Sequence, residues 1–83
     1  MDKALSLRIL TPDGPVFDGP VEAAFLPGSG GPFEVLPGHA PIISSLEAGS
    51  IVWRTGGKER SVVIKNGSAI QDKGIITVCV QLG

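Results

Sequence analysis

Apolar and polar residues alternate in short runs along this chain, and the runs end at glycine or proline. In the segment ALSLRIL, residues 4–10, the apolar Leu5, Leu7 and Ile9 are each separated by one residue. Successive side chains of a strand point to opposite faces, so this alternation predicts a half-buried strand. The other apolar runs are about four to eight residues long, which favours strands over helices.

Turn residues recur between these runs. TPDGP at residues 11–15 offers a proline followed by a glycine suited to a positive φ. TGGKE at residues 55–59 lies between two apolar runs and predicts a hairpin. The signal is repeated at residues 66–67, Asn-Gly, and at residues 72–74, Asp-Lys-Gly. Short strands with turns at this spacing predict an all-β fold, an antiparallel sandwich or barrel.

Length and composition narrow the classes of protein and of site. The 83 residues are enough for one domain, which we expect to span residues 1–83. Seven Lys and Arg against eight Asp and Glu give a net charge of −1, which does not fit a nucleic-acid binder. One cysteine and one histidine exclude an internal disulfide and a structural zinc site. A partner protein is the remaining common source of extra stability for so small a domain.

Three candidates for chemistry have simpler structural interpretations. The GSGG segment at residues 28–31 is followed by proline and lacks the Lys-Ser/Thr pair of a P-loop. Cys79 lies between two valines, where a buried, unreactive thiol is expected. Trp53 shares a strand face with Ile51 and is expected in the core. A hydrolase that uses His39 stays open as an alternative and requires a Ser or Cys within hydrogen-bond reach of the ring.

The segment LPGSGGPFEVLPGHAPIISSLEAG, residues 26–49, has glycine or proline at half of its first sixteen positions. It resembles the epsilon subunit of F-type ATP synthase, whose sandwich domain carries a pattern close to LPG-x-x-G-x-F-x-V-L-P-G-H-A-P, followed by a hydrophobic pair and Ser/Thr-x-L-x-x-G. The similarity continues on both sides, over residues 7–28 and 66–80. The matching positions are Leu26, Pro27, Gly28, Gly31, Phe33, Val35, Leu36, Pro37, Gly38, His39, Ala40, Pro41, Ile42, Ile43, Ser44, Leu46 and Gly49.

The resemblance implies a flattened antiparallel β-sandwich of about ten short strands in two sheets. It also implies a non-catalytic subunit of the central stalk, or rotor, without catalytic, metal or cofactor residues. Such a subunit fastens the gamma subunit to the c-ring and helps to couple ion-driven rotation to ATP synthesis. Its expected place is peripheral, on the cytoplasmic face of the bacterial inner membrane, or on the stromal side in a plastid.

Two contact segments follow from the resemblance, residue by residue. The gamma subunit is expected to contact residues 39–44. Replacing both Ile42 and Ile43 with Asp is predicted to weaken that contact. The turn nearest the c-ring often carries acidic residues in the family but has none here. The gamma contacts are His39, Ala40, Pro41, Ile42, Ile43 and Ser44, and the c-ring contacts are Gly28, Ser29, Gly30, Gly31 and Pro32.

The sequence departs from the family at its end. Many members continue with two helices that inhibit ATP hydrolysis and in some cases bind ATP, whereas this sequence stops at Gly83. We therefore expect no ATP-binding hairpin in this chain, and both a natural full-length chain and an excised domain stay open. The rival hypothesis is a freestanding small β-sandwich that binds a carbohydrate or peptide. That rival predicts a groove with exposed aromatic side chains.

Overall fold

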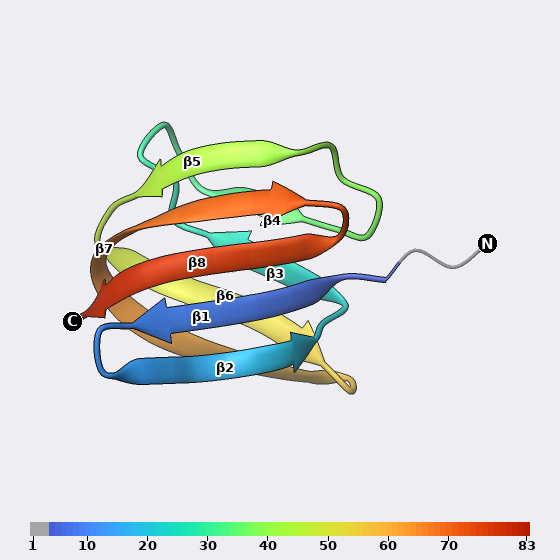
Figure 1. The fold of residues 1–83 in the computed structure, drawn as a ribbon, viewed down its shortest axis with the longest axis horizontal. Helices are drawn as coiled ribbons and strands as arrows, with labels where there is room; N and C mark the ends of the chain where they lie inside the picture. The colour runs from blue at the N-terminus through green and yellow to red at the C-terminus, as the bar shows by residue number, and fades with distance from the viewer. Residues whose placement is uncertain (1–3) are drawn as a thin grey trace.

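The computed structural model describes residues 4–83, so residues 1–3 of the expected domain lie outside the described part. Every regular element in this part is a strand, which confirms the all-β prediction (Figure 1). Within the described residues, therefore, no helix is available to cross a membrane. The strands are β1 (Ser6–Thr11), β2 (Gly14–Pro20), β3 (Ala23–Leu26), β4 (Phe33–Val35), β5 (Ile42–Leu46), β6 (Gly49–Thr55), β7 (Lys58–Asp72) and β8 (Ile75–Leu82).

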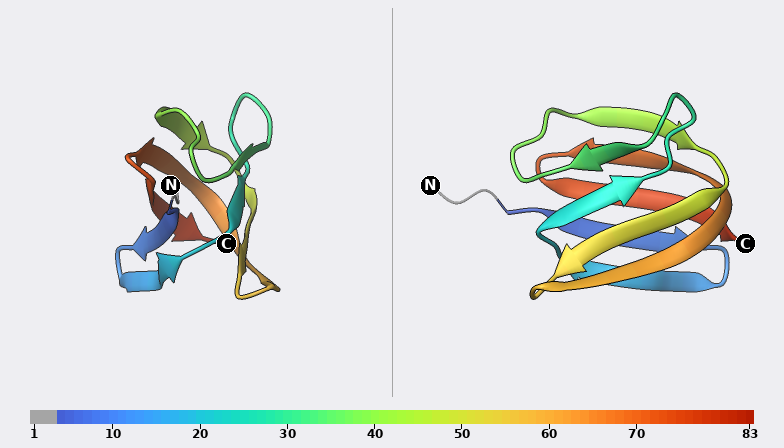
Figure 2. Two further views of the ribbon diagram at one scale, coloured as in Figure 1. Left: turned by 90° about the vertical axis from the view of Figure 1, so that its right-hand side faces the viewer. Right: turned by 180° about the vertical axis from the view of Figure 1, so that it is seen from behind.

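One strand, β7, belongs to both layers of the sandwich. Its residues 58–64 pair with β6. Its residues from Ile64 onward pair with β8, and residues 67–71 also pair with β5. Layer 1 thus contains β5, the second half of β7, β8, β1 and β2, and layer 2 contains the first half of β7, β6, β3 and β4. Figure 2 shows the two layers facing each other, with β7 passing from one to the other.

The structure corrects the expected number and direction of strands. The predicted β-sandwich is confirmed, with eight strands where about ten were expected. They form one continuous sheet in the order β2-β1-β8-β7-β6-β3-β4, with β5 beside β7, and this sheet folds into the two layers. The Asn66-Gly67 pair was predicted to be a turn, but it lies inside β7 at a shift of register between Ile64 and Asn66. One pair, β1 with β8, is parallel, and the other strand pairs are antiparallel as predicted.

Two tight turns have the backbone that their sequences predict. Gly56 and Gly57 connect β6 to β7 with φ of 59° and 75°. Lys73 and Gly74 connect β7 to β8 with φ of 53° and 78°. Positive φ at both central residues matches the right-handed twist of the flanking strands, so these connections are short hairpins.

The core lies between the two layers. The predicted alternation in β1 is confirmed, because Leu5, Leu7 and Ile9 are all buried. Trp53 on β6 is buried as predicted, and its ring centroid lies 5.0 Å from that of Phe17 on β2, so this pair joins the layers. The remaining residues of the buried cluster are Val21, Ala24, Leu26, Val35, Leu46, Ile51, Ile64, Ala69, Ile76, Val78 and Val80.

Cys79 contradicts the prediction of a buried thiol. It is exposed, because Val78 and Val80 point into the core and the residue between them therefore points outward. The alternation was correctly recognised, but the inward face was assigned to the wrong residue.

Candidate functional site

The two predicted contact segments lie on the same side of the sandwich, at opposite ends of β5 (Figure 1). Gly28–Pro32 belongs to the loop between β3 and β4. His39–Ser44 covers the end of the loop between β4 and β5 and the beginning of β5. Most residues of both segments are exposed, and Gly28 is the buried exception. The segments are therefore accessible from solvent.

A short ladder of hydrogen bonds attaches the Gly28–Pro32 loop to β5. Gly28 forms a bridge with Leu46. The Ser29 amide donates to the Ser45 carbonyl at 3.0 Å, and the Ser45 hydroxyl donates to the Ser29 hydroxyl at 3.0 Å. The Glu47 amide closes the ladder by donating to the Pro27 carbonyl at 2.9 Å. The loop and the strand that carries the second contact segment are thus joined directly.

Residue 28 has to be glycine because the Gly31 backbone and the Phe33 ring lie too close to it for a side chain. The Gly31 amide donates to the Gly28 carbonyl at 2.9 Å and closes the loop. A Cβ atom at residue 28 would lie 2.7 Å from the Gly31 oxygen and 2.7 Å from the Phe33 ring. At Gly30, by contrast, a Cβ atom would meet nothing within 4 Å. The tip of the loop therefore has room for a side chain, whereas its base has none.

His39 lies in an exposed turn. Its amide donates to the Leu36 carbonyl at 3.0 Å, and its ring Nδ1 lies 2.8 Å from the Ala40 carbonyl. The ring partner within residues 4–83 is thus a backbone carbonyl, without the Ser or Cys that a hydrolase requires. No group of three or more metal-binding side chains gathers anywhere in that same range. The geometry supports a loop histidine that interacts with local backbone.

The hydrophobic pair of the second contact segment is divided between two environments. Ile42 is half-buried and packs against the core, whereas Ile43 is 87% exposed. Directly across from Ile43 on β7 lies Ile70, which is 52% exposed. A hollow of about 560 Å³ runs beside these two side chains and is also lined by Pro41 and Asp72. The exposed apolar surface is therefore formed by both β5 and β7, whereas the sequence predicted only the segment that includes the beginning of β5.

Sequence reasoning missed Ile70. The alternation Ala69-Ile70-Gln71 was a sufficient signal that Ile70 faces the opposite side from Ala69, which is buried. What the alternation did not contain was the pairing of β7 with β5, which sets Ile70 opposite Ile43.

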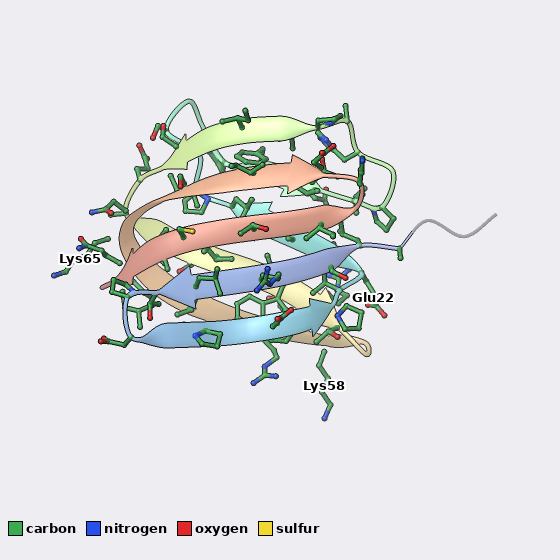
Figure 3. The ribbon with its side chains drawn as sticks, in the orientation of Figure 1. Glu22, Lys58 and Lys65 are labelled. Carbon is green, nitrogen blue, oxygen red and sulfur yellow. The ribbon has the colours of Figure 1, made fainter. Side chains whose placement is uncertain are left out.

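Most charged side chains lie away from this surface, and Asp72 is the one that borders its hollow. Between Glu22 and Glu47 the sequence has one formally charged residue, Glu34. Figure 3 shows Lys58 and Glu22 at the opposite edge, near the β6–β7 hairpin and β2, and Lys65 at the bend of β7. The contact segments therefore offer apolar side chains and backbone polar groups, with few charges.

The rival hypothesis of a carbohydrate- or peptide-binding sandwich lacks its expected platform. Trp53 is buried, and Phe17, Phe25 and Phe33 are half-buried. The large apolar side chains that are exposed within residues 4–83 are all aliphatic. No fully exposed aromatic side chain is thus present in the described part of the chain.

The family model of the ATP synthase delta/epsilon chain, β-sandwich domain, matches residues 4–82. The chain therefore belongs to this ATP synthase delta/epsilon-chain family. The resemblance inferred from residues 26–49 is confirmed. The matched residues include nearly all of the described part of the chain, so the family assignment applies to the whole sandwich.

Curated members of the delta/epsilon-chain family are similar over most of this chain. It is 39% identical over 77 residues to the ATP synthase epsilon chain of Rippkaea orientalis, covering 93% of this chain and 57% of the relative. It is 42% identical over 73 residues to the ATP synthase epsilon chain of Wolinella succinogenes, covering 87% of this chain and 56% of the relative. The chain thus spans a little over half the length of these relatives.

Two solved structures confirm the fold. A chain of the Euglena gracilis mitochondrial ATP synthase structure, described as OSCP/F1/c-ring, matches with a TM-score of 0.87 at 24% identity and covers 96% of this chain and 52% of its own length. A chain of the Tetrahymena thermophila mitochondrial ATP synthase structure, described as central stalk/c-ring, matches with a TM-score of 0.76 at 13% identity. It covers 93% of this chain and 63% of its own length.

Proposed function

We propose that this chain is the β-sandwich part of a non-catalytic central-stalk subunit of F-type ATP synthase. It fastens the gamma subunit to the c-ring and helps to couple ion-driven rotation to ATP synthesis. His39–Ser44 contacts gamma, and Gly28–Pro32 contacts the c-ring. The subunit takes no part in bond-making and is peripheral, on the cytoplasmic face of the bacterial inner membrane.

The ladder between Gly28–Ser29 and Ser45–Leu46 carries this proposal. A coupling subunit has to hold two partners at a fixed separation, and this ladder ties the loop for one partner to the strand for the other. Prolines 27, 32, 37 and 41 further restrict the backbone around both segments. Preordered surfaces lose less conformational entropy on binding, so this stiffness favours firm attachment.

The proposed gamma contact is tested by replacing Ile43 with Asp. We expect binding to purified gamma subunit to weaken about tenfold or more, because a charge at the apolar centre of an interface is desolvated without a partner. Ile42 is left unchanged because it packs against the core, where Asp would also destabilise the fold. The measurement is a titration of labelled chain with gamma.

The matched control is Val63→Asp. Val63 is 59% exposed and lies on the first half of β7, in layer 2. The same charge is therefore introduced at another exposed aliphatic position, on the other layer, and gamma affinity is expected to stay unchanged. Equal affinities for Ile43→Asp and the unmodified chain would remove the gamma contact from this surface.

The proposed c-ring contact is tested by Gly30→Phe at the tip of the loop. Because a Cβ atom there meets nothing within 4 Å, the fold is expected to keep its thermal midpoint. The bulky ring is expected to obstruct docking, so membranes with the reassembled complex should pump fewer ions per ATP hydrolysed. Full pumping with a normally incorporated Gly30→Phe chain would exclude this loop from the ring contact.

A further inference from the structure

Gln71 has 3% of its surface exposed. It is the one buried residue with a polar or charged side chain within residues 4–83. It lies near the end of β7, on the same face as Ala69, and is paired with Ile42 on one side and Ile76 on the other. The alternation of β7 would place an apolar side chain here. An amide at this position therefore needs an explanation.

Only one end of this amide is satisfied. The Nε2 group donates to the His39 carbonyl at 3.3 Å. The Oε1 atom is buried and has no hydrogen-bond partner. A buried acceptor without a partner lowers the free energy of unfolding, so Gln71 makes the body less stable than an apolar residue of similar size would.

The hydrogen bond from Gln71 attaches the turn that contains His39 to β7. Among the hydrogen bonds of residues 36–41, the bond from His39 to Leu36 and the contact of its ring with Ala40 are local. The bond from Gln71 is the one that reaches another element. Two hollows, of about 560 and 460 Å³, flank Gln71 and both border Pro41, so side-chain packing around the turn is sparse.

We infer that Gln71 is a positioning residue that holds the turn Gly38–Pro41 against the end of β7. The turn leads directly into Ile42 and Ile43, so its position sets the shape of the surface offered to gamma. This second step rests on the proposed function, whereas the attachment of the turn does not. The core gives up stability at this position in exchange for a fixed contact surface.

The test is Gln71→Leu, which keeps the volume approximately and removes both polar atoms. We expect the urea midpoint to stay equal or rise, because an unsatisfied acceptor disappears from the core. We expect the backbone order parameters of Gly38, His39 and Ala40 to fall from about 0.85 toward 0.6. Affinity for gamma should fall about three- to tenfold, because the turn then has to be ordered on binding.

A matched control separates positioning from general stability. Ile64→Val, on the same strand and also buried, should lower the urea midpoint while leaving the order parameters of the turn and the gamma affinity unchanged. Unchanged order parameters in Gln71→Leu would overturn the inference. A looser turn with normal gamma affinity would overturn its second step if Ile43→Asp still weakens binding. If Ile43→Asp also has no effect, the proposed gamma contact itself fails.

Discussion

Replacing Trp53 with alanine is expected to lower the free energy of unfolding by about 3–5 kcal/mol. The indole is 3% exposed, and it packs against Phe17 across the two layers with 5.0 Å between ring centroids. Truncation removes this contact and leaves a cavity between the layers that the surrounding strands fill only in part. A domain of this size has a total stability of about 4–12 kcal/mol, so the variant should be close to unfolding.

Urea unfolding followed by circular dichroism measures this effect. Trp53→Phe provides a graded comparison, because the indole Nε1 has no hydrogen-bond partner and phenylalanine therefore loses no bond there. Its cost should be clearly smaller than that of alanine. Val63→Ala, on the exposed surface, should change the stability by less than about 0.5 kcal/mol. A Trp53→Ala chain as stable as the unmodified one would mean that the two layers are not held together at this contact.

Replacing Gly67 with alanine is expected to destabilise the sandwich by about 2–3 kcal/mol. Inside a strand, alanine is normally better than glycine. Here the added Cβ atom would lie 2.6 Å from the Cys79 carbonyl oxygen and 2.7 Å from a methyl group of Val80. Since these atoms belong to the paired strand β8, relief of the clash requires a shift of backbone.

Gly30→Ala is the control for this substitution, since the same methyl group is added where nothing lies within 4 Å. It should be neutral, or stabilising by about 0.4–1 kcal/mol through the unfolded chain. Thermal or urea unfolding of both variants gives the comparison. Equal midpoints for Gly67→Ala and Gly30→Ala would show that β7 and β8 separate at Gly67 more easily than the structure indicates.

Local patterns in the sequence predicted the local structure well. The alternation of Leu5, Leu7 and Ile9 and the two-glycine turn at residues 56–57 depend on backbone geometry over a few residues, so a short segment is enough to recognise them. The assignment of Trp53 to the core followed from the same alternation.

Features that depend on distant pairing were not predictable from these patterns. Asn66-Gly67 has the composition of a turn, but pairing with β8 and β5 keeps it within β7, and Gly67 is present because β8 approaches closely. For Cys79, the alternation fixed its relation to the flanking valines but not which face was buried. The parallel pairing of β1 with β8 has no local signal at all.

The residues of the candidate site also fall into those that the sequence predicted and those that depend on pairing between distant strands. The contact segments around residues 28–32 and 39–44 were predicted from a resemblance to a family, because their Gly- and Pro-rich pattern is continuous in sequence. Ile70 and Gln71 act next to these segments only through the pairing of β7 with β5. A linear pattern does not contain that neighbourhood, so both residues required the structure.

The parallel pair of β1 and β8 also has a consequence for synthesis of the chain. Ser6 is paired with Ile75, so the neighbour on that side of β1 is β8, which is synthesised after the other seven strands described here. The edge of β1 that takes β8 therefore stays without its partner strand until β8 has been synthesised. Pairing over such a long sequence separation is slow. The nascent chain therefore remains prone to aggregation until β8 has been synthesised, and chaperone binding during that interval should be concentrated on the β1–β2 hairpin.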